Sequence, residues 1–564
     1  MDSFNNYLKN SLNKNILPIL FLILGSCYIL FFYKLGAISL FDVDEPRYAE
    51  TARNILENRD WITPWFDGKI RYDKPILFYW LIAIAYKIFG INEFAARFWS
   101  ATFATSLVLL IFFIGRKFLS LRTAILSSLV FSISSQIILL ARASITDMTL
   151  TFFISTSLFL FYLGYTGNDR SRKYFYLLFY ACMALATLTK GPVGIVIPFL
   201  IIILFTLINK TFFSTFSKMM LFQGFFVMAI IILPWNLAMF KIHREEFIWQ
   251  FYIRHNINRF AGVVSGHDGS FFFYLPVILL GFFPWAIFLP SAILNTITSI
   301  KESPVKNKET ASIKFFALIW FFVVFFFFTI SKTKLATYIT PLFPPMAILV
   351  GKLFDDVMQE KEKVIRYLKL PVIILIITFF LISAFSVFFP AMVNKFKSDS
   401  VSSFFNNTID LKNIPWILSA VLIVGIVFFS ISWFKKLRQL SIFSLILSIF
   451  LFHLIGIIYV GPEIGRYRQD SLRDLSEFTR NIIKKDDVLI SYCFNKPSIL
   501  FYARHPVKEL NEHQREQLYN YLTSDTGVYV IIKKSSIYSL KDAPKYHILK
   551  NEGDYILISN RSTT

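Results

Sequence analysis

Residues 313–331 of the chain read IKFFALIWFFVVFFFFTIS. An apolar stretch of about 20 residues is long enough to cross the roughly 30 Å hydrocarbon layer of a membrane as a helix. Similar stretches recur near 16–34, 94–115, 122–140, 148–165, 174–189, 192–208, 219–240, 271–295, 336–352, 369–390, 414–434 and 440–460. The sequence therefore predicts about 13 transmembrane helices. The shorter stretch 75–90 begins at Pro75 and is predicted to be a re-entrant or interfacial helix.

The composition leads to the same class of protein. Of 564 residues, 55% are hydrophobic, 18% are aromatic and only 17% are charged. A soluble globular chain carries roughly 25% charged residues, and one or two cores could not bury this much apolar surface. A soluble enzyme, a fibrous protein and a disordered protein are thereby excluded, and a polytopic membrane protein remains.

The net charge of +22 tests the arrangement of the helices. In a soluble chain such an excess would suggest nucleic acid as a partner, but here it is explained by Lys and Arg held in cytoplasmic loops. The basic loops are 9–14, 116–122, 170–173, 210–218, 301–308, 361–369 and 435–438. All fall on one side if the N-terminus is inside, which favours an odd number of spans and no nucleic-acid partner. It also places 461–564 on the outer face.

The C-terminal region has a different, mixed composition. Val488–Cys493 and Gly527–Ile532 are predicted as strands, and Ser471–Lys484 and Glu509–Leu522 as helices. The predicted fold is an all-α polytopic membrane protein with a small α/β outer domain. Its domains are a membrane domain at 1–460, with an outer loop 35–93 that carries amphipathic helices, and an outer domain at 461–564.

Unusual polar residues gather in the predicted outer loops. Residues 41–50 read FDVDEPRYAE, so that Asp42, Asp44 and Glu45 fall within four positions just after a membrane exit. Such acids either cap a helix or lie in solvent, or they take a proton or bind a cation. The same alternatives hold for Asp147, and Lys74 is either a snorkelling anchor or a ligand for a lipid phosphate.

The sidedness of these residues is more informative than any one of them. The residues that map to the outer face are Asp42, Asp44, Lys74, Asp147, Lys190, His255 and Lys334. Carboxylates and cations at one membrane edge suit a lipid phosphate ester and an acid/base step on its head group. The interiors of the spans are almost free of charge, with His453 as the main polar exception, which argues against an ion-coupled transporter.

These motifs resemble those of a known family. The matching segments are Asp42–Glu50, Tyr72–Pro75, Ala141–Met148, Thr189–Pro192, Phe283–Trp285 and Lys334–Tyr338 with Pro341. They are similar to those of the bacterial aminoarabinose transferases that modify lipid A, within the protein-mannosyltransferase-like group of GT-C glycosyltransferases. The resemblance covers about residues 1–460 in matching order.

The resemblance implies transfer of a sugar from undecaprenyl phosphate to lipid A or another glycolipid at the periplasmic face of the bacterial inner membrane. Asp44 and Asp147 take the positions of the catalytic carboxylates. Substrate binding is expected of Asp42, Glu45, Arg47, Lys74, Lys190, Lys334 and Tyr338. No cofactor is required by the resemblance, although some members hold a divalent metal at the positions of Asp73 and His255.

Two alternatives remain open at this stage. The same chemistry could serve a protein hydroxyl or a different surface glycan, for which general-base help from Asp44 would matter more. A flippase or transporter of a lipid-linked sugar would instead keep its activity without Asp44 and fail when His453 is changed.

Overall fold

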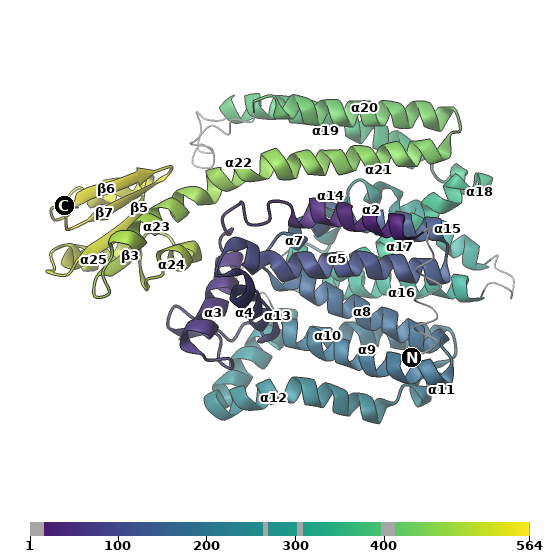
Figure 1. The fold of residues 1–564 in the computed structure, drawn as a ribbon, viewed down its shortest axis with the longest axis horizontal. Coiled ribbons are helices and arrows are strands. Elements are labelled where there is room, and N and C mark those ends of the chain that lie inside the picture. Colours follow the sequence, from purple (N-terminus) through teal and green to yellow (C-terminus); the bar gives the residue numbers. More distant parts are fainter. Residues whose placement is uncertain (1–15, 263–268, 302–307, 396–411, 563–564) are drawn as a thin grey trace.

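The computed structural model describes residues 16–262, 269–301, 308–395 and 412–562. A bundle of long helices carries a smaller α/β domain at one end, and the helices of the first outer loop lie between the two (Figure 1). Of the predicted basic loops, Lys9, Lys14 and Lys306 fall outside the described residues. The chain is a multi-span membrane protein.

Every predicted apolar stretch forms helix. Among the described residues, eight helices are long and apolar enough to cross a membrane, and two bent helix pairs could raise the count to ten. Their main elements are α5 (Glu93–Phe118), α8 (Thr146–Thr166), α12 (Leu221–Phe247), α16 (Lys308–Ile330), α17 (Phe343–Met358), α19 (Lys369–Lys395), α20 (Ile414–Phe434) and α21 (Arg438–Ile455). The bent pairs are α6 (Leu121–Ser132) with α7 (Ser135–Ala141), and α14 (Tyr274–Gly281) with α15 (Leu289–Lys301) and the turn before it.

Three further predicted spans form helices that this count leaves out. They are α2 (Leu17–Cys27), α9 (Asp169–Lys190) and α10 (Val193–Ile208). The helical fold of the membrane domain is therefore confirmed, while the number 13 stays a prediction.

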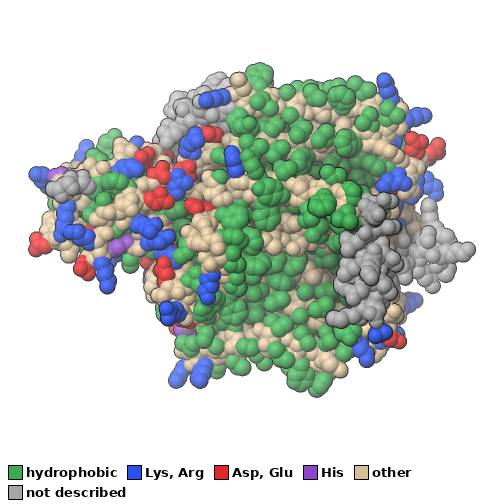
Figure 2. Space-filling view, in the orientation of Figure 1, with side chains coloured by type: hydrophobic (Ala, Val, Ile, Leu, Met, Phe, Trp, Pro, Cys, Tyr) green, Lys and Arg blue, Asp and Glu red, His purple; other side chains and the backbone are tan. Residues whose placement is uncertain are grey.

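The bundle has two charged ends and an apolar belt between them. Figure 2 shows hydrophobic side chains spread over the flank of the bundle, with Lys, Arg, Asp and Glu gathered at its ends and on the C-terminal domain. The short helices α11 (Phe212–Lys218) and α18 (Glu362–Arg366) belong to predicted basic loops and lie at the end away from the C-terminal domain (Figure 1). The predicted two-sided arrangement of the loops is thus present in the structure.

The first outer loop is a small structured layer. It contains α3 (Asp44–Asn58), the strands β1 (Trp65–Phe66) and β2 (Lys69–Ile70), and α4 (Leu77–Phe89). Asp67 and Gly68 join the strands with φ of 50° and 69°, as the two-residue turn of a tight hairpin requires. Helix α4, predicted as interfacial, has 13 residues and reaches only about 20 Å, which is too short to cross a membrane.

A buried ion pair fastens this layer to the membrane domain. Arg97 of α5 donates from Nε to Glu45 Oε1 at 2.8 Å and from Nη2 to Glu45 Oε2 at 2.7 Å. The same guanidinium donates to the carbonyl oxygens of Leu35, Ile38 and Ser39. Glu45 also accepts the backbone N–H of Phe41 and of Ser144. Because both charges are multiply hydrogen-bonded, the chain is fixed on either side of the start of α3.

The C-terminal domain is a five-stranded sheet in the order β4-β3-β5-β7-β6. The strands are β3 (Val488–Tyr492), β4 (Val507–Leu510), β5 (Val528–Lys533), β6 (His547–Glu552) and β7 (Tyr555–Ser559). Strands β3, β4 and β5 run parallel, and β7 is antiparallel to β5 and β6. Helix α24 (Pro497–Ala503) connects β3 to β4, and α25 (Arg515–Leu522) leads toward β5. The predicted α/β domain is confirmed.

One detail of the C-terminal region differs from the prediction. The segment Glu509–Leu522 is predicted as one helix, but its first two residues belong to β4, because they pair with β3. The predicted domain boundary between 460 and 461 falls within helix, which runs from Arg438 through α23 (Ser471–Ile482), with wide π-helical turns at Gly456–Val460 and Arg466–Asp470.

We expect Arg97→Met to lower the free energy of unfolding by about 3–5 kcal/mol, because Glu45 would stay buried without its counter-charge. Chemical or thermal unfolding of the purified protein in detergent measures the change. The matched control is Arg466→Met, which removes an exposed partner of Glu463 and should change stability little. Equal losses in the two variants would show that the buried pair has no special role.

Candidate active site

Two cavities of different character meet where the first outer loop covers the bundle. One has a volume of about 1070 Å³ and lies between α3, the segment 66–74 and the C-terminal domain. The other has a volume of about 430 Å³ and is largely apolar. The residues that line both are Asp73, Lys74, Lys190, His255, Arg259 and Tyr338. Any reaction between an apolar-anchored molecule and a polar one would take place at this junction.

The smaller cavity is built from the ends of membrane helices. Its apolar lining includes Leu150 of α8, Val193 and Val196 of α10, and Phe327 and Phe328 of α16. These side chains lie near the helix ends that face the C-terminal domain. The cavity therefore offers a hydrocarbon surface that leads directly to the polar junction.

The larger cavity receives the start of α3. Asp44 and Arg47 lie in the first turn of this helix and line the cavity. Pro46 suits a first helical turn, where no N–H partner is needed, and an acid there is favoured by the helix dipole. The sequence thus presents one carboxylate and one guanidinium to the polar side of the junction.

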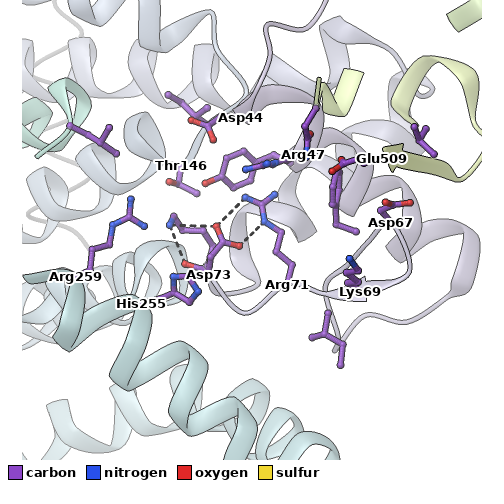
Figure 3. Close-up of a pocket in the computed structure, with 18 of the residues that line it drawn as sticks. Asp44, Arg47, Asp67, Lys69, Arg71, Asp73, Thr146, His255, Arg259 and Glu509 are labelled. Carbon is purple, nitrogen blue, oxygen red and sulfur yellow. Dashed lines mark hydrogen bonds and ion pairs between the residues drawn. The ribbon is translucent and has the colours of Figure 1, made fainter. Parts of the chain in front are cut away.

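Asp73 lies at the centre of the junction and is held by two cations (Figure 3). Arg71 donates to it from Nε at 2.6 Å and from Nη2 at 3.1 Å. Lys74 Nζ lies 3.7 Å from Asp73 Oδ2 and donates to the Asp73 backbone oxygen at 3.0 Å. Burial raises the pKa of Asp73, but Arg71 and Lys74 outweigh it and hold that pKa well below its usual range. Asp73 is therefore an anion that organises cations rather than a proton acceptor.

Lys74 loses its positive charge at a lower pH than an ordinary lysine. Burial lowers its pKa to about 8, and the charges of Arg259, Lys190 and Arg71 act in the same direction, while Asp73 opposes them. An arriving phosphate would relieve this repulsion. Lys74 is accordingly suited to binding an anion at neutral pH.

A second ion pair completes the junction. Lys190, the last residue of α9, donates to Asp147 Oδ1 at 2.6 Å, and Asp147 lies in the first turn of α8. Lys190 Nζ also lies 4.6 Å from the centroid of the Tyr338 ring, and the Arg259 guanidinium carbon lies 5.7 Å from it. Three cations, Lys74, Lys190 and Arg259, thus surround one space beside a tyrosine ring.

The residues expected to hold a metal do not fit one. In the part of the chain that the structure describes, no three His, Cys, Asp or Glu side chains lie together as a metal site would need. Both carboxylate oxygens of Asp73 already accept hydrogen bonds from Arg71, and Lys74 lies beside them. His255 lines both cavities, and its Nδ1 has no hydrogen-bond partner among the described residues. A divalent cation at this place would meet one carboxylate that is already shared and several positive charges that repel it.

Three residues expected to bind substrate lie away from both cavities. Asp42 accepts hydrogen bonds from Ser498 of the C-terminal domain, and Glu45 pairs with Arg97. Lys334 Nζ donates to the backbone oxygens of Thr329 and Ser331 at the end of α16. The structure brings together the other expected residues, namely Asp44, Arg47, Asp73, Lys74, Asp147, Lys190, His255 and Tyr338.

Other lining residues were not expected from the sequence. Arg71 lies two residues before Asp73, and Arg259 lies one helical turn after His255, so their spacing from expected residues was the available signal. On the opposite side of the larger cavity, Figure 3 shows Asp67, Lys69 and Glu509. No local pattern points to Glu509, because it reaches the cavity only through the packing of the C-terminal sheet.

The chain is similar to known proteins over much of its length. A family model described as dolichyl-phosphate-mannose-protein mannosyltransferase matches residues 17–248. An uncharacterized protein of Aquifex aeolicus is 31% identical over 332 residues, which are 59% of this chain and 72% of the relative. An undecaprenyl phosphate-alpha-4-amino-4-deoxy-L-arabinose arabinosyl transferase of Wigglesworthia glossinidia brevipalpis is 30% identical over 361 residues, 63% of this chain and 62% of the relative. The chain thus spans less than two thirds of the length of that transferase.

A solved structure shares the fold over nearly the whole chain. The crystal structure of ArnT from Cupriavidus metallidurans bound to undecaprenyl phosphate matches with a TM-score of 0.79 at 20% identity. The match covers 96% of this chain and 98% of that one. The C-terminal domain is therefore part of the shared fold.

Metal binding at the junction can be tested directly. We expect titration of the purified protein with Zn²⁺ or Mg²⁺ to give no saturable heat that depends on Asp73 and His255, because Arg71 and Lys74 already occupy the carboxylate of Asp73. Isothermal titration of the wild type beside His255→Ala measures this. Saturable binding that is lost in His255→Ala would show a metal site after all.

Proposed function

The chain belongs to the protein-mannosyltransferase-like family of GT-C membrane glycosyltransferases, and we propose that it transfers an amino sugar from undecaprenyl phosphate to lipid A. The observation that carries the proposal is the meeting of an apolar and a polar cavity at Lys74, Lys190 and Arg259. A polyprenyl phosphate has one hydrocarbon end and one anionic end, and this junction has a matching surface for each.

The donor would lie with its first prenyl units in the apolar cavity. Its phosphate would then reach the cations at the junction, where charge-assisted contacts hold it. Its sugar would extend into the larger cavity toward Asp44 and Arg47. The arabinosyl transferase relative names an amino sugar on undecaprenyl phosphate, which supports this donor.

The reaction would be a direct displacement at the anomeric carbon. The bond between this carbon and the donor phosphate oxygen breaks, and the electron pair leaves with the polyprenyl phosphate. Lys74 and Lys190 stabilise the charge that develops on the leaving phosphate, because they are already in place before the bond breaks. An oxygen of the acceptor forms the new bond.

Asp44 would act on the acceptor side. A lipid A phosphate is already anionic and needs little help from a base, so Asp44 would position the acceptor or the sugar amine. A neutral hydroxyl acceptor on a protein or another glycan would need Asp44 to take its proton. The active site and the C-terminal domain would face the periplasm from the inner membrane, since α11 and α18, which belong to two predicted basic loops, lie at the opposite end of the bundle.

The flippase alternative has weaker support in the structure. His453, the polar residue on which it relied, faces Ser135 with its Nε2 at 3.0 Å and the Ile449 backbone oxygen with its Nδ1 at 2.9 Å. These contacts satisfy the ring within the helix packing, as expected for a structural histidine.

Mass spectrometry of lipid A tests the proposed function. Cells that express the wild-type chain should carry lipid A with the added mass of an amino sugar, and Asp44→Asn should lose it, because the variant lacks the carboxylate at the reacting centre. The matched control is Asp542→Asn, an exposed position in the C-terminal domain, which should retain the added mass.

Unchanged lipid A in wild-type cells would contradict lipid A as acceptor. A sugar found on proteins or on another glycan, and lost in Asp44→Asn, would then identify the alternative acceptor. Sugar transfer that survives in Asp44→Asn would contradict the catalytic role of this carboxylate.

Binding of undecaprenyl phosphate should weaken as the pH rises through about 8. Lys74 has a lowered pKa of about 8 in the free protein, so it loses its charge above that pH, whereas an ordinary lysine keeps its charge to about 10.4. Between pH 7 and pH 9 the dissociation constant should rise by about tenfold, as the charged fraction falls. Titration in detergent with intrinsic fluorescence measures it.

The control for this pH dependence is Lys74→Arg. Arginine stays charged throughout the range, so the variant should show a flatter profile whatever its absolute affinity. A wild-type affinity that is constant between pH 7 and pH 9 would contradict the role of Lys74 as the titrating ligand.

A further inference from the structure

We propose that Asp42 and Ser498 are positioning residues, and that through this contact the C-terminal domain fixes the place of Asp44 in the active site. The proposal deepens the proposed function and rests on it. It concerns an acid that sequence reasoning assigned to substrate binding and that the structure places at the interface between the two domains.

The polar contacts of Asp42 are with the C-terminal domain. Ser498 donates its backbone N–H to Asp42 Oδ1 at 2.9 Å and its hydroxyl to Oδ2. The side-chain amide of Gln469, oriented to satisfy both groups, donates to Asp42 Oδ2 at 3.0 Å and accepts the Asp42 backbone N–H at 3.0 Å. Asp42 therefore links two elements of the C-terminal region, α24 and the wide turn before α23, to the segment just before α3.

The contact also satisfies a helix end. Ser498 is the second residue of α24, after Pro497, and the first N–H groups of a helix have no partner within it. Asp42 supplies that partner from a segment more than 450 residues away in sequence. A carboxylate that accepts hydrogen bonds at a helix N-terminus is favoured by both the hydrogen bonds and the dipole.

Helix α24 is seated on the first outer loop at further points. Arg53 Nη1 donates to the Phe501 backbone oxygen at 2.9 Å. The Tyr502 hydroxyl accepts the Leu40 N–H at 2.9 Å and donates to Glu93 Oε1 at 2.9 Å. Helix α24 thus contacts the chain before Asp44, through Leu40 and Asp42, and after it, through Arg53.

Asp44 lies between two fixed neighbours. Asp42 is held by the C-terminal domain, and Glu45 is held by Arg97 of the membrane domain. Neither of these two acids lines the two cavities of the junction, whereas Asp44 does. The three acids of the motif therefore have different roles. Asp42 and Glu45 anchor the backbone to opposite domains, and Asp44 lines the larger cavity.

This arrangement predicts a particular kinetic effect. A displacement of about 1 Å at a reacting group can cost on the order of 100-fold in rate. Loss of the anchor should therefore lower kcat, while the KM for the donor should stay nearly constant, because Lys74 and Lys190, which hold the donor phosphate, lie on other elements. A purely structural role would instead lower the amount of folded protein without this split.

The experiment compares Asp42→Ala, Asp42→Asn and Ser498→Ala in the full-length protein, with donor and acceptor supplied in detergent. We expect Asp42→Ala to lower kcat by about tenfold and Ser498→Ala by a smaller factor. Asp42→Asn should retain more activity than Asp42→Ala, because its amide oxygen still accepts the Ser498 N–H and its amide nitrogen can donate to the Ser498 hydroxyl, so that only the hydrogen bond from Gln469 is lost. The double variant Asp42→Ala/Ser498→Ala should be no slower than Asp42→Ala, since both remove the same contact.

The conservative variant separates the two roles of Asp42. If Asp42 bound substrate through its charge, Asp42→Asn would remove that charge and would be as slow as Asp42→Ala. Equal kcat values in these two variants would therefore overturn the proposal. Unchanged kcat in Asp42→Ala and Ser498→Ala would also overturn it. Thermal unfolding and undecaprenyl phosphate binding, measured on each variant, identify any loss that comes from misfolding, and a wild-type protein without transfer activity would refute the proposed function instead.

Discussion

The buried ion pair between Glu45 and Arg97 is the constraint on which the active site depends. It joins the first turn of α3 to a membrane helix, and the same guanidinium gathers three backbone carbonyls of the preceding segment. A charge pair taken out of water contributes little net stability by itself. Its value here is geometric, because it holds the start of α3 and the segment before it against α5. The position of Asp44 is a result of that arrangement, since Asp44 lies next to Glu45 in the same helical turn.

The junction brings an apolar surface and a polar surface together. In the proposed reaction both the donor and lipid A are lipid-anchored, yet their reacting groups are polar and must meet. Helices α8, α10 and α16 supply the apolar wall, and the first outer loop and the C-terminal domain supply the polar one. Burial lowers the pKa of Lys74 most, and repulsion from the neighbouring cations Arg259, Lys190 and Arg71 lowers it further. An anion that enters the junction is thus bound partly because it relieves the repulsion between these cations.

The sequence predicted the helical membrane domain, the α/β outer domain and most of the junction. Apolar length and residue type are local properties, so each predicted span formed helix, and Asp44, Lys74, Asp147 and Lys190 all reached the cavities. Three expected substrate-binding residues line neither cavity, and the reason is common to all three. Asp42, Glu45 and Lys334 have the right charge and lie on the right side, but their partners are set by tertiary packing: Ser498, Arg97 and the end of α16. The strand pairing that turns Glu509 toward the cavity is equally invisible in a local pattern.

The continuous helix from Arg438 to Ile482 sets the orientation of the C-terminal sheet relative to the bundle. Each residue added to a helix rotates the rest of the chain by about 100° and advances it by about 1.5 Å. The C-terminal sheet is therefore set at one angle about the helix axis and one height above the bundle by the number of residues in this segment. A flexible linker would fix neither the angle nor the height of the sheet, and the sheet would have to reach its docked position by diffusion. In this chain the number of residues in one helix therefore decides which side of the sheet faces the start of α3.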